Sequence, residues 1–137
     1  MALVIDASIA LGWISPRQAT PLTDAALAVV AREFGCVPAY FGIEVARVLR
    51  NHERRNLLAA DVVDAWLAQL RALPLREDSF RTLDTVQDVM LLARRHALRV
   101  ADAAYLELAV RAALPLATRD DSLARAAETA GVVLFKS

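Results

Sequence analysis

Short apolar runs alternate with longer amphipathic stretches along this chain. Residues 2–5 (ALVI) are wholly apolar and end at a charged side chain, Asp6, as a buried parallel strand does. Further strands are predicted at 36–37, from 74–75, at 114–118 and at 132–135. Helices are predicted between them, at 7–13, 23–34, about 40–56, 61–72, 82–97, 101–113 and 120–130.

The stretch 61–72 shows a helical period, because its apolar residues fall at positions 62, 63, 66, 67 and 70. Gly35 and Gly131 each follow a predicted helix, and we expect them to cap it. Strands that alternate with helices predict an α/β fold, with a mainly parallel sheet of about five strands and helices on both faces. Ligands of such sheets bind beyond the carboxyl ends of the strands.

Length and composition predict one domain, 1–137, that does not enter a membrane. A chain of 137 residues can form a single good core, and 57% of its residues are hydrophobic. The longest wholly apolar run, 25–31, is far shorter than the roughly 18 residues that a membrane span needs. The amino-terminal residues also lack the basic segment of a secretory signal. We expect the surplus apolar surface to contact an obligate partner chain, a second copy in a homodimer, or both.

The charge balance excludes binding to nucleic acid through bulk positive charge. The chain carries 16 basic and 16 acidic residues, so only local patches could bind phosphate. Every basic residue except Lys136 is an arginine, which is the better bidentate phosphate ligand. The single cysteine, Cys36, cannot form an internal disulfide, and this favours a reducing cytoplasm. The two histidines, His52 and His96, lack the spacing of a zinc site.

Four acidic residues lie in or beside apolar segments, where a lone carboxylate is costly to desolvate: Asp6, Glu44, Asp102 and Asp120. An α/β fold can bring all four to one place. Carboxylates that share a cleft repel one another and raise each other's pKa unless a cation lies between them. A hard divalent ion with oxygen ligands, Mg²⁺ above all, would relieve this repulsion.

Two of these acids also suit a purely structural role. Asp6 ends the first strand and could cap the next helix, although Ser8 two residues later adds a hydroxyl able to hold its carboxylate. Asp120 follows a strand and could cap the last helix. Asp121 competes for the same roles, and Thr118 at i−2 favours Asp120 on the side of the site.

The other two acids lie within predicted helices. Asp102 shares an apolar face with Leu106 and Val110, so it should point inward, although a first-turn acid is also stabilised by the helix dipole. Glu107 and Arg111 form an i, i+4 pair on another face, and we interpret Glu107 as a solvated surface residue.

Glu44 lies in FGIEVARVL, where, for this residue taken alone, a hydrogen bond to Arg47 or exposure to solvent would be the simpler explanation. Arg47 begins a basic stretch with Arg50, Arg54 and Arg55. This stretch is either an exposed helix end or a phosphate clamp beside the acidic site.

Four segments together resemble the motifs of a known family. DASIALGW, IEVARVL, RVADAAYLELA and LATRDDSLARAA are similar to the motifs of PIN-domain ribonucleases, specifically the VapC-type toxins of prokaryotic toxin–antitoxin pairs. The likeness extends from residue 3 to about 130. It implies a PIN-like three-layer sandwich.

The resemblance places the family's acidic quartet on Asp6, Glu44, Asp102 and Asp120, with Ser8 and Thr118 as accompanying hydroxyls. It implies an endoribonuclease that depends on Mg²⁺ or Mn²⁺ and cuts tRNA or ribosomal RNA. It also implies a toxin homodimer and a small VapB-type antitoxin whose tail blocks the cleft.

One departure from the family pattern E-x-x-N-x-L concerns Arg47, which occupies the asparagine position. Arg47 could pair with Glu44 and weaken its hold on a metal, or it could bind substrate phosphate. As a mechanism, we expect Asp6 and Asp102 to bind the metal directly. Glu44 would act through water or a second ion, and Asp120 would orient that water or complete the shell.

Rival classes fit less well. A phosphatase of the haloacid-dehalogenase type needs D-x-D, and here Ser8 replaces the second acid. A receiver domain needs an acceptor aspartate after its third strand and also a late lysine, and Lys136 lies too near the end of the chain. A non-catalytic PIN-like binding module, with Arg47 occluding the site, stays as an alternative.

Overall fold

The computed structural model describes residues 1–78 and 82–137. Its described part contains a parallel sheet in the order β3–β2–β1–β4. The strands are β1 (Leu3–Ile5), β2 (Gly35–Val37), β3 (Leu75–Glu77) and β4 (Leu116–Ala117). The central strand β1 is buried along its whole length, because helices cover both of its faces.

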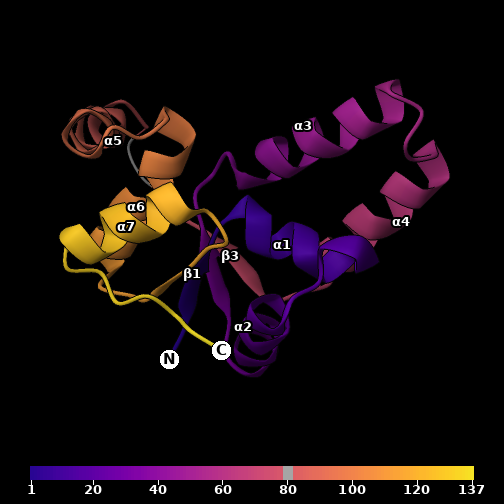
Figure 1. Ribbon diagram of the computed structural model, residues 1–137, viewed down its shortest axis with the longest axis horizontal. Coiled ribbons are helices and arrows are strands. Elements are labelled where there is room, and N and C mark those ends of the chain that lie inside the picture. Colours follow the sequence, from indigo (N-terminus) through magenta and orange to yellow (C-terminus); the bar gives the residue numbers. More distant parts are fainter. Residues whose placement is uncertain (79–81) are drawn as a thin grey trace.

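Helices surround this sheet in the three-layer arrangement that the sequence predicts. Figure 1 shows α1 and α2 to one side of the strands, α6 and α7 to the other, and α3 and α4 extending outward as an arm. The helices are α1 (Ala7–Ile14), the 3₁₀ turn η1 (Pro16–Gln18), α2 (Pro21–Arg32), α3 (Phe41–Arg54), α4 (Ala60–Arg71), α5 (Thr82–His96), α6 (Val100–Ala112) and α7 (Asp121–Thr129). The α/β fold class is confirmed.

The fifth predicted strand, at 132–135, does not form a full ladder in the described chain. Leu134 makes a single parallel bridge to Leu116, and the amide of Phe135 donates to the carbonyl of Leu116 at 2.9 Å. The segment therefore runs beside β4, but β4 is only two residues long and offers little more to pair with.

The two glycines expected as helix caps behave differently. Gly131 adopts a left-handed backbone with φ +80°, and the amide of Val132 donates to the carbonyl of Ala127 at 2.8 Å, so it caps α7 as predicted. Gly35 is instead the first residue of β2, and the expectation of a cap there was wrong. A Cβ at Gly35 would lie 2.9 Å from Leu75, so close packing against β3 explains the glycine.

A second close approach joins α1 to α2. A Cβ at Gly12 would lie 2.4 Å from Cγ2 of Thr23, a fully buried residue. The indole of Trp13 donates a 2.8 Å hydrogen bond to the carbonyl oxygen of Thr23. These contacts fix the position of α1, whose first turn follows the carboxyl end of β1.

Within the described ranges, no helix is both long and apolar enough to cross a bilayer. Several large apolar side chains are nevertheless exposed: Ile43 by 74%, Leu57 by 59% and Leu83 by 84%. Such exposure is consistent with the expectation of a protein partner.

Candidate active site

All four predicted acids line one cavity of about 210 Å³, which we call the acidic cavity. Asp6 directly follows β1, and Asp120 lies three residues after β4 ends. Because β1 and β4 are parallel neighbours, their carboxyl ends meet at one edge of the sheet. The first turns of α3 and α6 bring Glu44 and Asp102 to the same edge.

Asp6 is the most buried acid of the cavity, with an exposed fraction of 4%. Its Oδ1 accepts hydrogen bonds from the hydroxyl of Ser8 at 2.6 Å and from the amide of Ile9 at 3.1 Å, and its Oδ2 accepts one from the hydroxyl of Thr118. Burial raises the pKa of Asp6 to about 6, although these hydrogen bonds oppose the shift. Repulsion from Glu44 also raises the pKa of Asp6, as the sequence predicted, but it is the smallest of these causes.

The two hydroxyls also join the ends of β1 and β4. Ser8 Oγ accepts from the amide of Arg119 at 3.0 Å, and Thr118 Oγ1 accepts from the amide of Asp120 at 3.0 Å. Each hydroxyl therefore donates a hydrogen bond to the Asp6 carboxylate and accepts one from an amide of the β4–α7 loop. This arrangement fixes the Asp6 carboxylate without placing a positive charge beside it.

Helix capping and cavity lining are compatible roles for these acids. Asp6 caps α1 through Ile9, and Asp120 caps α7 by accepting from the amide of Leu123 at 2.9 Å. Both carboxylates still line the acidic cavity. Asp120 rather than Asp121 lines the cavity, and Asp121 is exposed at the start of α7.

Asp102 is paired with a residue that the sequence argument missed. Nε of Arg99 lies 3.0 Å from Oδ2 of Asp102, and this interaction raises the pKa of the Arg99 guanidinium. Arg99 is the N-cap of α6, where an acceptor side chain such as serine is usual, and its side chain is 75% exposed. An arginine at the N-cap position was the feature of the sequence that could have indicated this pairing. Val110 is 48% exposed, so the apolar face shared by Asp102 ends at Leu106.

Glu44 also has a partner that the sequence argument missed. The hydroxyl of Tyr105, a residue that is 1% exposed, donates to Oε1 of Glu44 at 2.5 Å. Arg47 lines the same cavity, but its side chain is exposed. The hydrogen bond on Glu44 thus comes from Tyr105, which leaves Arg47 available at the mouth of the cavity.

The donor set suits a hard divalent cation, because four carboxylates surround one small cavity. Among the residues that the structure describes, no group of three or more His, Cys, Asp or Glu side chains is placed to hold a metal ion. Each of the four carboxylates accepts a hydrogen bond from another group of the chain. The contact of Arg99 is with Oδ2 of Asp102, and the second carboxylate oxygen of Asp102 could bind an ion.

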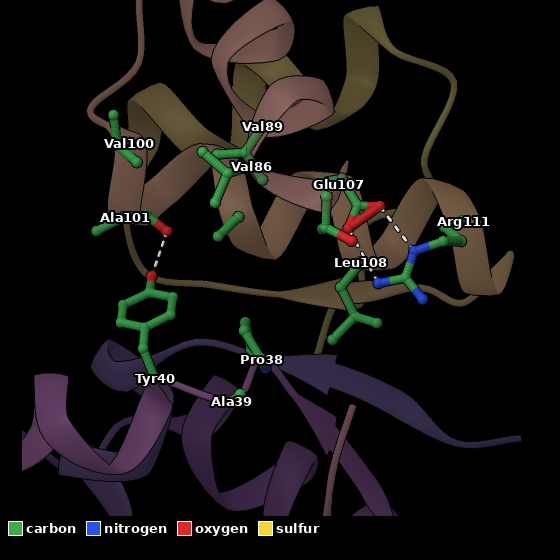
Figure 2. A pocket seen from close by; sticks show the side chains of 12 residues that line it. Pro38, Ala39, Tyr40, Val86, Val89, Val100, Ala101, Glu107, Leu108 and Arg111 are labelled. Atoms are coloured by element: carbon green, nitrogen blue, oxygen red, sulfur yellow. Dashed lines mark hydrogen bonds and ion pairs between the residues drawn. The ribbon is translucent and has the colours of Figure 1, made fainter. Parts of the chain in front are cut away.

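A larger cavity, of about 440 Å³, lies between the β2–α3 loop, α5 and α6 (Figure 2). We call it the apolar cavity; its lining includes Pro38, Ala39, Tyr40, Val86, Val89, Val100, Ala101, Ala104 and Leu108. It offers few groups for chemistry, so the smaller acidic cavity is the candidate active site.

Glu107 lies in the wall of the apolar cavity and is 6% exposed, so its interpretation as a solvated residue was wrong. Its carboxylate pairs with Arg111 through contacts of 2.8 and 3.0 Å (Figure 2). Arg111 also contacts Asp78 at 2.5 Å. The i, i+4 pairing was predicted, but α6 is buried around most of its circumference. Residues 105–109 are all buried, so no solvated face exists there.

The fold and the acidic cavity together define an α/β protein with a carboxylate-lined site at the carboxyl edge of its sheet. The sequence profile of the PIN domain matches residues 3–129, and the chain belongs to the PIN-domain family. The predicted resemblance is thereby confirmed.

Individual proteins of known sequence or structure support this assignment. The chain is 35% identical over 124 residues to Ribonuclease VapC3 of Mycobacterium tuberculosis. The aligned residues cover 90% of this chain and 86% of the relative. It resembles PAE2754 from Pyrobaculum aerophilum with a TM-score of 0.70 at 19% identity, over 92% of this chain and 84% of the other. It also resembles VapBC2 from Rickettsia felis bound to a DNA fragment from their promoter, with a TM-score of 0.67 at 11% identity, over 98% of both chains. At these identities the two structures show a shared fold.

Proposed function

We propose that this chain is the toxin of a toxin–antitoxin pair, a metal-dependent endoribonuclease that hydrolyses RNA phosphodiester bonds and is neutralised by a cognate VapB-type antitoxin. The observation that carries the proposal is the convergence of four carboxylates on one cavity in a PIN-domain chain. The 35% identity to a protein named as a ribonuclease supports the same reaction.

Asp6 and Asp102 are the proposed direct ligands of Mg²⁺ or Mn²⁺, and Glu44 and Asp120 complete the site through water or a second ion. When bound, such an ion neutralises charge on the scissile phosphate and makes a coordinated water more acidic. Ser8 and Thr118 hold the Asp6 carboxylate in place with their hydroxyl protons. With a pKa of about 6, Asp6 is mainly ionised at neutral pH and able to bind a cation.

Two arginines are placed to bind the RNA backbone. Arg47 from α3 and Arg99 from the start of α6 both line the acidic cavity. Both are largely exposed, and a guanidinium binds phosphate in a bidentate manner. Their proposed role is to position the scissile phosphate over the carboxylates.

The partner chains remain part of the proposal. Exposed apolar residues such as Ile43 and Leu83 support a homodimer, an antitoxin complex or both. The antitoxin would block access to the acidic cavity. The proposed functional unit is the single domain 1–137. Its free cysteine, Cys36, supports action in the reducing cytoplasm.

The direct test is cleavage of total tRNA and ribosomal RNA by the purified chain, with p-nitrophenyl phosphate assayed in parallel. We expect RNA products with 5′-phosphate and 3′-hydroxyl ends, loss of activity in EDTA and recovery with Mg²⁺ or Mn²⁺. Asp102→Asn should lower cleavage at least about tenfold, because a proposed metal ligand is lost.

The matched control is Asp121→Asn, which removes an exposed carboxylate from the same edge and should leave cleavage within about twofold. Cleavage that persists in EDTA, or full activity in Asp102→Asn, would contradict the proposal. Binding of RNA without cleavage would indicate the non-catalytic module instead.

A further inference from the structure

Two tyrosines cross-link the first turns of α3 and α6 in a reciprocal way. Tyr40, immediately before α3, donates its hydroxyl proton to the carbonyl oxygen of Ala101 in the first turn of α6 (Figure 2). Tyr105, one turn further along α6, donates to Glu44 in the first turn of α3. We call this pair of tyrosines the tyrosine clasp.

The rings of the clasp pack against each other, with centroids 5.9 Å apart and an angle of 55° between their planes. Tyr105 is 1% exposed, and a buried hydroxyl that lost its acceptor would be left without a hydrogen bond. Burial raises the pKa of Tyr105, which keeps its hydroxyl protonated and able to donate. The clasp is therefore a rigid connection rather than a surface contact.

The clasp also separates the two cavities. Tyr40 and Ala101 line the apolar cavity, whereas Glu44, Tyr105 and Asp102 line the acidic cavity. Tyr40 and Glu44 are four residues apart, and so are Ala101 and Tyr105. The two hydrogen bonds of the clasp therefore lie one helical turn apart and together restrain the distance and the rotation of α3 relative to α6. Glu44 and Asp102 are carried by those two first turns.

We infer that the tyrosine clasp holds Glu44 in place relative to Asp102, which makes Tyr105 a positioning residue of the acidic site. This inference rests on the proposed nuclease function and deepens it. Without its hydroxyl donor, the Glu44 side chain would be free to take other rotamers, and the site would lose its preorganisation. Tyr40 supports the same geometry through the backbone of α6.

The test is Tyr105→Phe, which removes the hydroxyl and retains the ring. We expect kcat for RNA cleavage to fall about tenfold with KM for RNA unchanged, because substrate-binding groups are untouched. Calorimetry on the RNA-free protein should show affinity for Mn²⁺ lowered about tenfold as well. Tyr40→Phe should have a smaller effect of the same kind, since Glu44 keeps its own donor.

The matched control is Glu107→Gln, which removes a buried ion pair on the same helix, α6, where Glu107 contacts Arg111 at 2.8 and 3.0 Å. It should lower Tm while leaving Mn²⁺ affinity within about twofold, so that a general loss of stability is distinguished from loss of positioning. If Tyr40 and Tyr105 act as one unit, the double variant should lose less than the product of the two single losses.

Unchanged kcat and Mn²⁺ affinity in Tyr105→Phe would overturn the inference while leaving the proposed function intact, provided that the wild type binds Mn²⁺ and cleaves RNA. A wild type that does neither would overturn both. If Tyr105→Phe fails to fold by near-ultraviolet circular dichroism, Tyr40→Phe carries the test: weaker Mn²⁺ binding supports the clasp, and unchanged binding overturns it.

Discussion

Asp6 and Glu107 are both buried carboxylates, but different donors satisfy them. Asp6 accepts from two neutral hydroxyls and one amide, and its pKa is raised to about 6. Glu107 pairs with the guanidinium of Arg111, whose pKa the pairing raises. The charge of Glu107 is therefore balanced within the chain, whereas Asp6 lies in a cavity with three further acids. A buried acid without a cation of its own is the better indicator of a functional site.

Substitutions that remove the charge of Asp6 or of Glu107 should distinguish the proposed metal-binding role of Asp6 from the structural role of Glu107 most clearly. Asp6→Asn keeps a side chain of similar shape and should lower RNA cleavage at least about a hundredfold, because a proposed metal ligand is lost. Cleavage of a defined RNA under single-turnover conditions measures this effect. An active Asp6→Asn protein would remove the basis of the comparison.

Glu107→Gln is the matched variant, and its effect should appear in stability instead. Loss of the ion pair should lower the free energy of unfolding by about 1 to 2 kcal/mol, less than for a fully buried pair, because the Arg111 side chain is 42% exposed and keeps Asp78. Urea denaturation measures this change, and cleavage should stay within about twofold of wild type.

The dependence of stability on pH should sharpen the comparison further. Asp6 has a pKa of about 6 in the folded chain, above the 3.8 of an unperturbed aspartate, so the folded state binds the proton more tightly. Its contribution to stability is complete below about pH 3.8 and is lost as the pH rises through about 6. Relative to Asp6→Asn, the metal-free wild type should therefore lose up to about 3 kcal/mol between pH 4 and pH 7.5.

Urea denaturation in EDTA at several pH values within this window provides the measurement. The difference between wild type and Asp6→Asn isolates this one carboxyl from the others that titrate. Parallel curves for the two proteins would show that burial does not raise the pKa of Asp6.

The smallest expected effect concerns the arginine at the mouth of the acidic cavity. Arg47→Gln should raise KM for RNA about fivefold at low salt and reduce the slope of log affinity against log salt by about one, with kcat little changed. Arg50→Gln is the control on the same helix, since Arg50 pairs with Glu53 at 3.0 Å. Equal effects of the two substitutions would mean that Arg47 makes no specific phosphate contact.

The periodicity of the apolar residues and the breaks between apolar segments predicted most of the fold. The helix at 61–72 was evident because its apolar residues repeat at 3.6-residue intervals, and α4 occupies Ala60–Arg71. Asp6 and Asp120 could be assigned to one edge because each follows a short apolar strand. The segment 132–135 looked equally strand-like, but only a neighbouring strand with free hydrogen-bonding groups can complete a ladder.

The partner of Glu44 and the burial of Glu107 were beyond the reach of a single sequence. Tyr105 and Glu44 are 61 positions apart, and nothing local marks them as a pair. Glu107 and Arg111 have the spacing of a surface pair, and only the packing of α6 shows that the pair is buried. Arg99 was detectable in principle, because a cation at a helix N-cap is electrostatically unfavourable unless a nearby acid compensates it.

The contact between α1 and α2 at Gly12 has a consequence for the chemistry. Even a methyl group there would overlap Thr23, so α1 would have to tilt or slide away from α2. Asp6 and Ser8 lie at the other end of α1. A shift of this helix would therefore move them away from Thr118, which donates a hydrogen bond to Asp6. The absence of a side chain at Gly12, remote from the acidic cavity, therefore keeps Asp6 and Ser8 aligned with Thr118.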